Sequence, residues 1–254
     1  MAKKSGIGQQ FYLQGVDMSG DVGSLSSIAT PRGIQVVTGI DRDAFERILT
    51  QTDGAISFSA FLNDVAGGTH LTLGALPITD VHIMYMTGET LGDPTFCMVG
   101  KQVNYDPTRA ADGSLTIAVD AKLSAGEPAE WCRMLKSNGT HASATDETGH
   151  LVDSGGVQTT KGGVGYLQHF SAASGTVEYD IEDSSDSTNG IDGAWANLLA
   201  FSDVATPYTP IAERVEVTGA VEKYVRCSTN GTFTTAVLAM AFRRGTAFDD
   251  DDLS

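Results

Sequence analysis

The residues best suited to chemistry are the five histidines, and their spacing gives little support to a site. They are His70, His82, His141, His150 and His169, with no HExxH motif and no paired ligand spacing of the kind that zinc sites use. His141 and His150 lie near Asp146 and Asp153 and could in principle hold a metal ion. A glycine-rich loop positions ligands poorly, so a solvated loop is favoured and no metal is expected.

Two further patterns resemble ligand loops and fail on spacing. Residues 183–192 are rich in oxygen-bearing side chains and contain a glycine, but they lack the alternating ligands and the closing Glu of a calcium loop. The glycines of residues 162–165 precede a strand pattern rather than a helix, so they supply no helix N-terminus for a phosphate. No GxSxG motif occurs. We therefore expect no enzyme and no cofactor.

Charge is the strongest bulk property of the sequence. The 254 residues, enough for one large or two small domains, contain 32 acidic and 16 basic side chains, a net charge of −16, and residues 249–252 are four consecutive aspartates. Such a surface repels phosphate, which disfavours DNA or RNA binding. The protein either has no role with nucleic acid or must lie beside it without binding it. A purely solubilising charge is the plainer alternative.

Compartment signals are few. The longest apolar run, residues 236–242, is far shorter than the ~20 residues that a membrane-spanning helix needs. No apolar stretch follows the basic N-terminus, so we expect no secretory signal. The cysteines, Cys97, Cys132 and Cys227, form no CxxC motif, which favours reduced thiols in a cytoplasm.

The elements that would have to position any site are mostly strands. Short apolar runs rich in Val, Ile, Thr and aromatic residues end at Gly, Asn or Asp, as strands and turns do. Two short helices are expected, at residues 43–49 after a capping-box-like start and at residues 194–201. The strands are expected at residues 34–39, 56–61, 70–73, 81–86, 95–103, 114–123, 164–170, 176–181, 215–217, 221–227 and 232–242.

An internal repeat gives a possible domain plan. Residues 53–58 align with 174–179, and residues 112–121 with 230–239, in the same order and at nearly the same offset. Turn-strand units also resemble one another by chance, so duplication and coincidence both stay open. The plan is an N-terminal arm (1–29), a first β-lobe (30–124), a polar linker or extended loop (125–163), a second β-lobe (164–244) and an acidic tail (245–254).

Aromatic residues of the second lobe indicate its core. Trp195, Phe201, Tyr224 and Phe233 occupy predicted strand or helix positions, where aromatic side chains usually pack inward. The run 232–242 is apolar at nearly every position, so it must be covered on both faces, by a second sheet and a helix or by a neighbouring subunit.

The order of several segments resembles the major tail proteins, or tail tube proteins, of long-tailed viruses of bacteria and archaea. The segments are Gly-Val-Asp-Met-Ser-Gly (15–20), Asp-Arg-Asp-Ala-Phe-Glu-Arg-Ile-Leu (41–49) with Asp-Gly-Ala-Ile-Ser-Phe (53–58), Tyr-Leu-Gln-His-Phe (166–170), Trp-Ala-Asn-Leu-Leu-Ala-Phe (195–201), Lys-Tyr-Val-Arg-Cys (223–227) and Asn-Gly-Thr-Phe-Thr-Thr-Ala (230–236). The resemblance covers most of the chain and rests on turns and strands, without a catalytic motif.

The resemblance implies a mainly β fold: a tail-tube-like β-sandwich or barrel, in one lobe or two, with one or two short helices and long loops. Copies would assemble into trimeric or hexameric rings that stack into a tube, with other tail proteins at its ends and no membrane partner. Genomic DNA would pass through without binding, because carboxylates in the lumen repel phosphate. Which acidic residues face the lumen is left open. The protein would belong to the virion tail, and to the host cytoplasm during assembly.

Two alternatives remain from the sequence. Residues 176–195 and 222–226 also resemble discoidin-like carbohydrate-binding modules, in which Trp195 would stack on a sugar. The packed sequence that follows Trp195 favours a core position instead. A capsid decoration or tail-tip protein is the third possibility.

Overall fold

The computed structural model describes residues 6–76, 78–124, 126–142, 145–146, 151–152, 160–185 and 194–245, the two short pairs by their backbone alone. His150, most of the loop 183–192 and all but the first residue of the expected acidic tail lie outside the described residues. The chain divides into two compact units. The first contains residues 1–19, 82–97 and 130–254, and the second contains residues 20–81 and 98–129.

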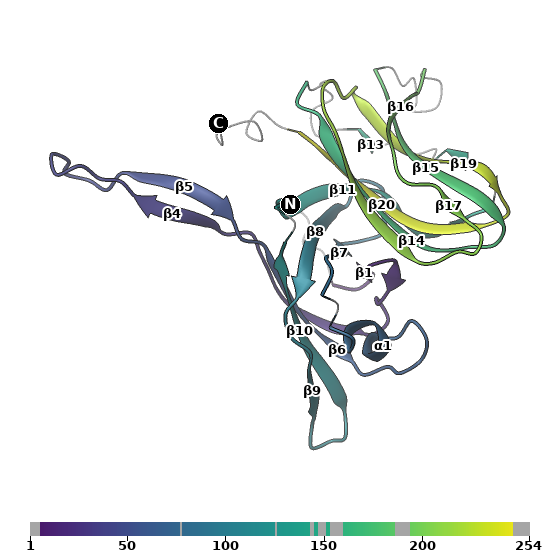
Figure 1. The fold of residues 1–254 in the computed structure, drawn as a ribbon, viewed down its shortest axis with the longest axis horizontal. Coiled ribbons are helices and arrows are strands. Elements are labelled where there is room, and N and C mark those ends of the chain that lie inside the picture. Colours follow the sequence, from purple (N-terminus) through teal and green to yellow (C-terminus); the bar gives the residue numbers. More distant parts are fainter. Residues whose placement is uncertain are drawn as a thin grey trace. The chain divides into compact units, whose positions relative to one another are not determined.

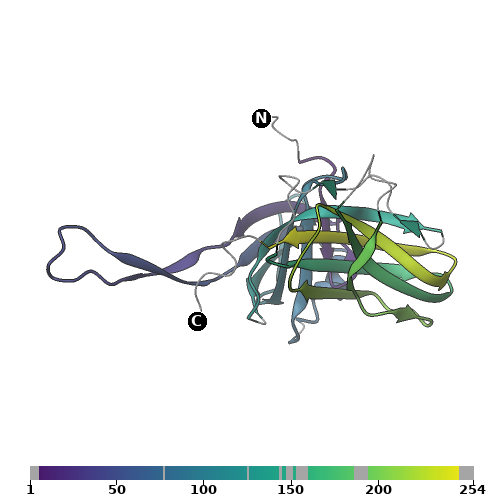
Figure 2. The same cartoon turned by 90° about the horizontal axis from the view of Figure 1, so that it is seen from above.

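The first unit is built from two antiparallel sheets (Figures 1 and 2). One sheet has the order β18-β14-β20-β11-β8, with β7, β1 and β2 joined to it, and the other has the order β12-β19-β15-β16, with β13 and β17. The strands are β1 (Gln10–Leu13), β2 (Val16–Asp17), β7 (Val81–Met86), β8 (Pro94–Gln102), β11 (Glu130–His141), β12 (Thr145–Asp146), β13 (Leu151–Val152), β14 (Gly163–Ala172), β15 (Gly175–Ser184), β16 (Ala196–Ala200), β17 (Val204–Ala205), β18 (Ile211–Val217), β19 (Tyr224–Phe233) and β20 (Ala236–Arg244).

The core of the first unit is one apolar cluster. Strand β20 sends Leu238, Met240 and Phe242 into it, while Ala239 and Ala241 on the opposite face are also buried. Both faces of this apolar strand are therefore covered within a single chain, and β20 needs no neighbouring subunit. The remaining buried members are Leu135, Leu167, Val177, Tyr179, Ile181, Leu199, Phe201, Val204, Val221, Val225, Cys227, Phe233 and Ala236.

The second unit contains the part of the 12-stranded sheet with the order β8-β10-β6-β3, and a separate hairpin of β4 and β5 (Figure 1). Its apolar face is formed by alternate residues, Ile56 and Phe58 on β6 and Ile117 and Val119 on β10, all of which are buried. The elements are β3 (Val22–Ala29), β4 (Arg32–Val36), β5 (Arg47–Thr52), β6 (Ala55–Phe61), α1 (Thr69–Leu73), β9 (Asp106–Arg109), β10 (Leu115–Leu123) and the last residues of β8.

The mainly β fold is confirmed, and both expected helices are wrong. Residues 43–46 precede strand β5, and residues 47–49 are its first residues. Residues 196–200 form β16, which pairs with β15. A short helix is marginal without tertiary support, so cross-strand pairing overrides a local capping signal. In the described part of the chain the one α-helix is α1, at residues 69–73, where the sequence predicted a strand.

Two other segments differ from the sequence expectation. Residues 1–29, expected as an arm, contain β1, β2 and β3. The expected polar linker contains β11, whose Cys132, Met134 and Leu135 are buried. A bulged register with β20 interrupts the regular alternation of β11, which hides the strand pattern in the sequence.

The turn between β1 and β2 packs closely against the backbone of β14 and β18 in the first unit. Gln14 and Gly15, with φ values of 50° and 75°, form the two-residue loop between the paired residues Leu13 and Val16, as in a type I′ hairpin. The Gly15 amide donates to Gln168 Oε1 at 2.6 Å. A Cβ atom on Gly15 would lie 2.7 Å from both the His169 carbonyl oxygen and the Ile211 nitrogen. The turn therefore requires glycine for both conformation and space.

We expect Gly15→Ala to lower the free energy of unfolding by about 2–4 kcal/mol, because overpacking adds to a left-handed backbone penalty. Gly8→Ala is the matched control, since Gly8 has a φ of 83° and no atom lies within 4 Å of the place that a Cβ would occupy. That control should lose only about 1–2 kcal/mol. Urea denaturation of both variants measures the difference, and equal losses would contradict the steric argument.

Candidate assembly surfaces

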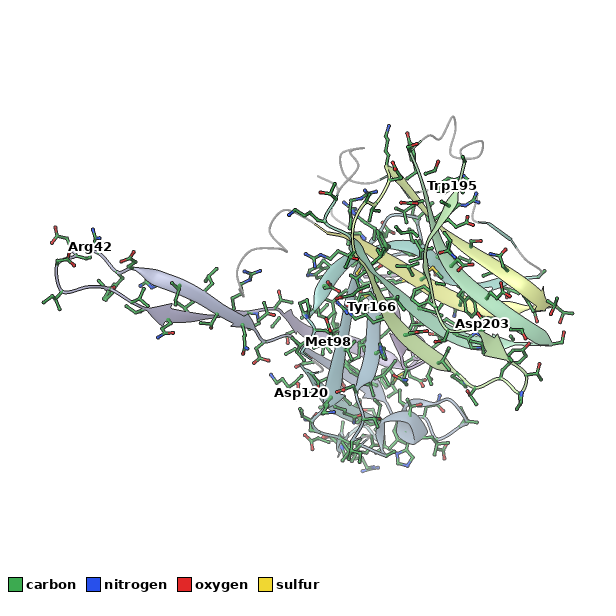
Figure 3. All side chains as sticks on the ribbon, turned by 45° about the horizontal axis from the view of Figure 1, so that its top comes forward. Arg42, Met98, Asp120, Tyr166, Trp195 and Asp203 are labelled. Carbon is green, nitrogen blue, oxygen red and sulfur yellow. The ribbon has the colours of Figure 1, made fainter. Side chains whose placement is uncertain are left out.

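The hairpin of β4 and β5, called the arm below, is the most exposed apolar element of the described chain. Ile34 pairs with Leu49 across the two strands, and their exposed fractions are 62% and 61%. Towards the tip, Phe45 is 71% exposed, and Ile40 has no cover at all. Figure 3 shows Arg42 at the outer end of the arm. The other exposed apolar residues of the arm are Val36, Val37 and Ile48.

Little within the chain stabilises the arm. Arg47 lies over the Phe45 ring with its guanidinium carbon 5.2 Å from the ring centre, and the Val37 amide donates to the Glu46 carbonyl. A two-stranded hairpin is marginal in water by itself, and clustered exposed apolar residues mark a contact surface. Residues 32–52 contain three acidic and three basic side chains, so the arm is neutral in a chain of charge −16.

Strand β3 presents an edge of a different kind. It pairs with β6 on one side and ends the strand order on the other. Its sequence, Val-Gly-Ser-Leu-Ser-Ser-Ile-Ala, contains no charged residue and no proline. Two register shifts bend the strand, but no charge blocks its free edge. Strand β18, which ends the strand order of the first unit, carries Glu213, Arg214 and Glu216.

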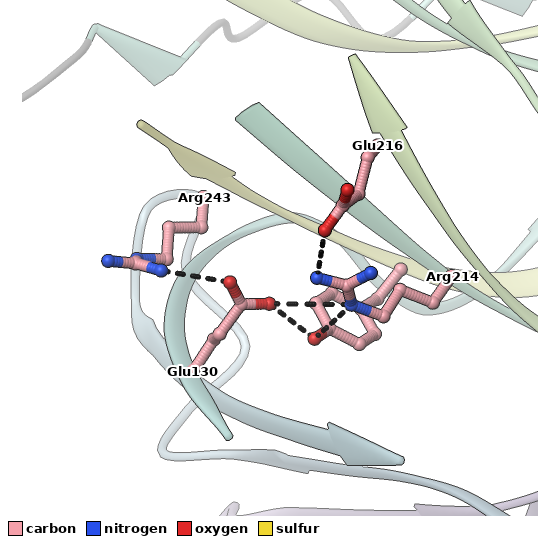
Figure 4. Close-up of polar contacts among 5 residues, drawn as sticks. Glu130, Arg214, Glu216 and Arg243 are labelled. Carbon is pink, nitrogen blue, oxygen red and sulfur yellow. Dashed lines mark hydrogen bonds and ion pairs between the residues drawn. The ribbon is translucent and has the colours of Figure 1, made fainter. Parts of the chain in front are cut away.

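Two of these side chains, Arg214 and Glu216, belong to a network around the buried Glu130 (Figure 4), whereas Glu213 accepts hydrogen bonds from Ser202. Glu130, on β11, accepts a hydrogen bond from Arg243 Nη1 at 2.8 Å and lies 3.7 Å from Arg214 Nε. The Tyr166 hydroxyl donates to the second Glu130 oxygen. Arg214 also contacts Glu216 at 2.5 Å. The network joins β11, β14, β18 and β20, so its role is to fix one sheet.

Burial and charge shift the titration of this network. Burial, reinforced by the negative charge of Glu130, raises the pKa of Tyr166, so its phenol stays protonated. Burial also raises the pKa of Cys97, aided by its contact with Cys132. A neutral phenol and a neutral thiol are poor nucleophiles.

We expect Glu130→Gln to lower the free energy of unfolding by about 3 kcal/mol, because it leaves Arg214 and Arg243 without their shared counter-charge. Glu216→Gln is the matched control: its carboxylate is 56% exposed, so its loss should cost less than about 1 kcal/mol. Chemical denaturation at pH 7 compares the two, and an equal cost would mean that the buried carboxylate has no special role.

His169 is a buried histidine in the core of the first unit. It is fully buried, its Nδ1 lies 2.6 Å from the Tyr179 hydroxyl, and its Nε2 has no hydrogen-bond partner. Burial lowers the pKa of His169 to about 4. The imidazole is therefore neutral at pH 7 and acts as part of the core.

This burial makes the first unit sensitive to acid. Between the ordinary histidine pKa and about 4, the unfolded chain binds a proton that the folded chain does not, so stability falls as pH decreases through that window. The contribution reaches about 3 kcal/mol. We expect His169→Phe to flatten the fall measured by thermal denaturation from pH 7 to pH 4. Tyr179→Phe, which keeps the imidazole, should retain the fall in stability. An unchanged pH dependence in His169→Phe would contradict the assignment of this fall to His169.

Of the four aromatic residues expected in the core, two are buried and two are partly buried. Phe201 and Phe233 are buried members of the core cluster of the first unit. Trp195 is partly buried, with the guanidinium carbon of Arg226 4.2 Å from its ring centre, and Arg226 binds Glu182 at 2.6 Å. Tyr224 is also partly buried, under Lys223. Figure 3 labels Trp195 beside β16. A cation already lies against one face of the ring that the carbohydrate alternative would use.

Other types of site find no support in the described residues. These residues contain no group of three His, Cys, Asp or Glu side chains that could hold a metal ion. His141 contacts Thr229 at 2.8 Å, while His150 is outside the described residues. Within the described ranges, no helix has the length and apolar character needed to cross a bilayer.

Comparison with known proteins gives distant structural matches. No family model matches the chain, and no curated protein matches it. The chain is similar to the Dit (gp 19.1) protein of phage SPP1, described as a hub of the adsorption apparatus of phages that infect Gram-positive bacteria. The identity is 11%, the TM-score is 0.31, and the match covers 93% of this chain and 99% of that one.

Two structures of the phage p2 baseplate in its activated conformation also match. The structure with Sr has 10% identity and a TM-score of 0.36, and the one with Ca has 9% and 0.34; each match covers 93% of this chain and 98% of that one. These are baseplate or hub proteins rather than the tail tube proteins that the sequence resembles. Matches this distant carry no functional argument, and the arm and the sheet edge carry the proposal below.

Proposed function

We propose that the protein is a structural component of a viral tail that self-assembles into stacked rings, and that DNA passes through the resulting tube. The observation that carries the proposal is the arm. Seven large apolar side chains are exposed on a ribbon of residues 32–52, which neither the sheet nor the helix of its own unit covers. Such a ribbon gains stability when its apolar side chains are buried on a partner.

The partner is a second copy of this chain. Copies with a charge of −16 repel one another, and the arm is a long segment in which acidic and basic residues balance. A neutral apolar ribbon can therefore approach an acidic neighbour where most other surfaces cannot. Repeated docking of one arm onto the next copy is a head-to-tail contact, which closes into a ring or continues as a filament.

The uncharged edge of β3 supports lateral assembly. An open edge without charges or proline offers its unpaired backbone groups to another strand. The charges of β18 make that strand a poorer acceptor, and Arg214 is held inward by Glu130 and Tyr166. Two unlike edges favour a directional contact over random pairing. The same features would serve a tail tube protein or a baseplate hub, which differ in the proteins that cap the ring.

The double variant Ile34→Thr/Leu49→Thr tests the role of the arm. We expect it to abolish assembly beyond the smallest species, while the free energy of unfolding changes by less than about 1 kcal/mol, because both side chains are already exposed in the single chain. Threonine keeps the β-propensity of the strands and removes most of the apolar surface. Light scattering after size-exclusion chromatography and negative-stain microscopy measure assembly over a range of concentration and salt.

Ile34→Val/Leu49→Ile is the matched control, because it preserves an apolar arm, and it should assemble as the wild type does. A wild-type protein that stays monomeric at high concentration and in varied salt would overturn the proposed function. Unchanged assembly in the threonine variant would be compatible with self-assembly but would show that the arm is not required for it.

A further inference from the structure

A second exposed apolar segment surrounds helix α1 (Figure 1). In the described part of the chain, nine large apolar side chains outside the arm are exposed, and four of them lie within residues 65–78. They are Val65, Leu71, Leu76 and Ile78, with exposed fractions of 58%, 57%, 45% and 91%. The other five are scattered over residues 7, 61, 103, 115 and 131. The four clustered residues are called the α1 face below.

The opposite side of α1 is held against its own unit. The Thr69 hydroxyl donates to the Phe61 carbonyl at the end of β6, and the Gln102 amide donates to the Leu73 carbonyl at 2.9 Å. Thr69 and Leu73 are the buried side chains of the helix, whereas Leu71 stays in solvent. The single chain therefore uses only one side of α1 for packing and leaves a leucine on the other.

Leu76 adds backbone strain to this exposure. Its φ is 44°, in the left-handed region, which glycine or asparagine adopts at a lower cost than leucine. Nearly half of the side chain is nevertheless in solvent. Residues in strained conformations concentrate at functional sites. A leucine that is both strained and exposed indicates a use for the side chain outside the single chain.

The α1 face is also free of charge. Residues 65–79 contain no Asp, Glu, Lys or Arg, in a chain with a net charge of −16. Asp80, which follows them, pairs with Lys101 at 2.8 Å, and Lys101 Nζ also donates to the Ile78 carbonyl at 3.1 Å. Acidic surfaces of two copies repel each other, so a neutral apolar face is a place where another neutral surface can approach.

The arm has the properties of an occupant for this face. Strand pairing places Ile34 opposite Leu49, and Val36, two residues after Ile34, lies on the same side of the hairpin. The arm is neutral as a whole and has 21 residues, while a standard interface uses about 20–30 residues from each partner. The uncharged segment around α1 supplies 15 residues, so one arm is large enough to cover it.

We propose that the α1 face receives the arm of a second copy of this chain. The inference rests on the proposed function and names the surface on which the arm docks. Contact between the two removes both clusters of exposed apolar side chains from water at once. Every copy carries one arm and one α1 face, so the contact is head-to-tail and can repeat from copy to copy.

Disulfide cross-linking between two singly substituted proteins tests the contact. Leu49→Cys on the arm and Leu71→Cys on the α1 face are prepared separately, one with a size tag, then mixed, assembled and oxidised with copper phenanthroline. The three native cysteines are buried and give little background. We expect a mixed dimer on a non-reducing gel, which can form only between different copies. If Leu49→Cys fails to assemble by light scattering, Ile34→Cys, on the opposite strand, replaces it.

Ile7→Cys in place of Leu71→Cys is the matched control, because Ile7 is 91% exposed and lies outside the α1 face. Equal linking to both positions would indicate random collision, and an assembled mixture without the mixed dimer would show that the arm docks elsewhere. Either result overturns the inference while self-assembly stands. A wild-type protein that does not assemble overturns the proposed function, and the inference with it.

Leu76→Asn supplies a second readout. We expect the protein concentration needed for half-maximal assembly to rise about tenfold, because an apolar contact is lost. The urea denaturation midpoint should stay the same or rise, since asparagine tolerates the left-handed backbone better. Leu115→Asn is the control, with a similar exposed fraction of 43% outside the α1 face, and should assemble as the wild type does. Unchanged assembly of Leu76→Asn, or an equal loss in the control, would contradict the inference.

Discussion

The constraint on which the proposed assembly depends is the exposure of the apolar side chains of the arm. A hairpin of two strands cannot bury these side chains by itself. Fully burying one large aliphatic or aromatic side chain contributes about 1.5–3 kcal/mol, so seven of them could contribute on the order of 10 kcal/mol or more. Association costs an estimated 4–15 kcal/mol in lost freedom, which makes one arm contact marginal. In the proposed ring every copy would give and receive an arm, and the later contacts would then form at high effective concentration.

Charge limits where those contacts can form. A chain of −16 resists self-association over most of its surface, and this keeps free copies soluble and apart. The neutral arm and the uncharged edge of β3 are local exceptions, so repulsion elsewhere restricts pairing to them. At about 0.1 M salt, repulsion between surface charges more than about 10 Å apart is largely screened, whereas apolar burial persists, so the proposed assembly should depend on ionic strength.

The sequence predicts the class of fold better than the elements that carry function. Period-two runs such as Ile56–Phe61 and Val81–Met86 identify strands, because burial on one face or both imposes the pattern. The first strand of the arm was predicted, at residues 34–39, but the second was missed, because Asp43 and Glu46 satisfy a local capping rule whereas pairing of β5 with β4 decides the conformation. Its signal was present in Ile34, Val36 and Ile48, β-branched residues poorly suited to a helix.

The sequence also leaves open which residues share one face of a sheet. The acidic composition of the whole chain predicts an acidic lumen, but composition does not say which side of a strand a residue occupies. Ser57 and Ser59 alternate with Ile56 and Phe58, so the pattern that identified β6 also assigns its serines to the uncovered face. Their neighbours Ser24, Ser27 and Asp120 are far away in sequence, and only the register joins them into rows. Residues that share a row of a sheet leave no motif in the sequence, because strand pairing brings together positions that lie far apart along the chain.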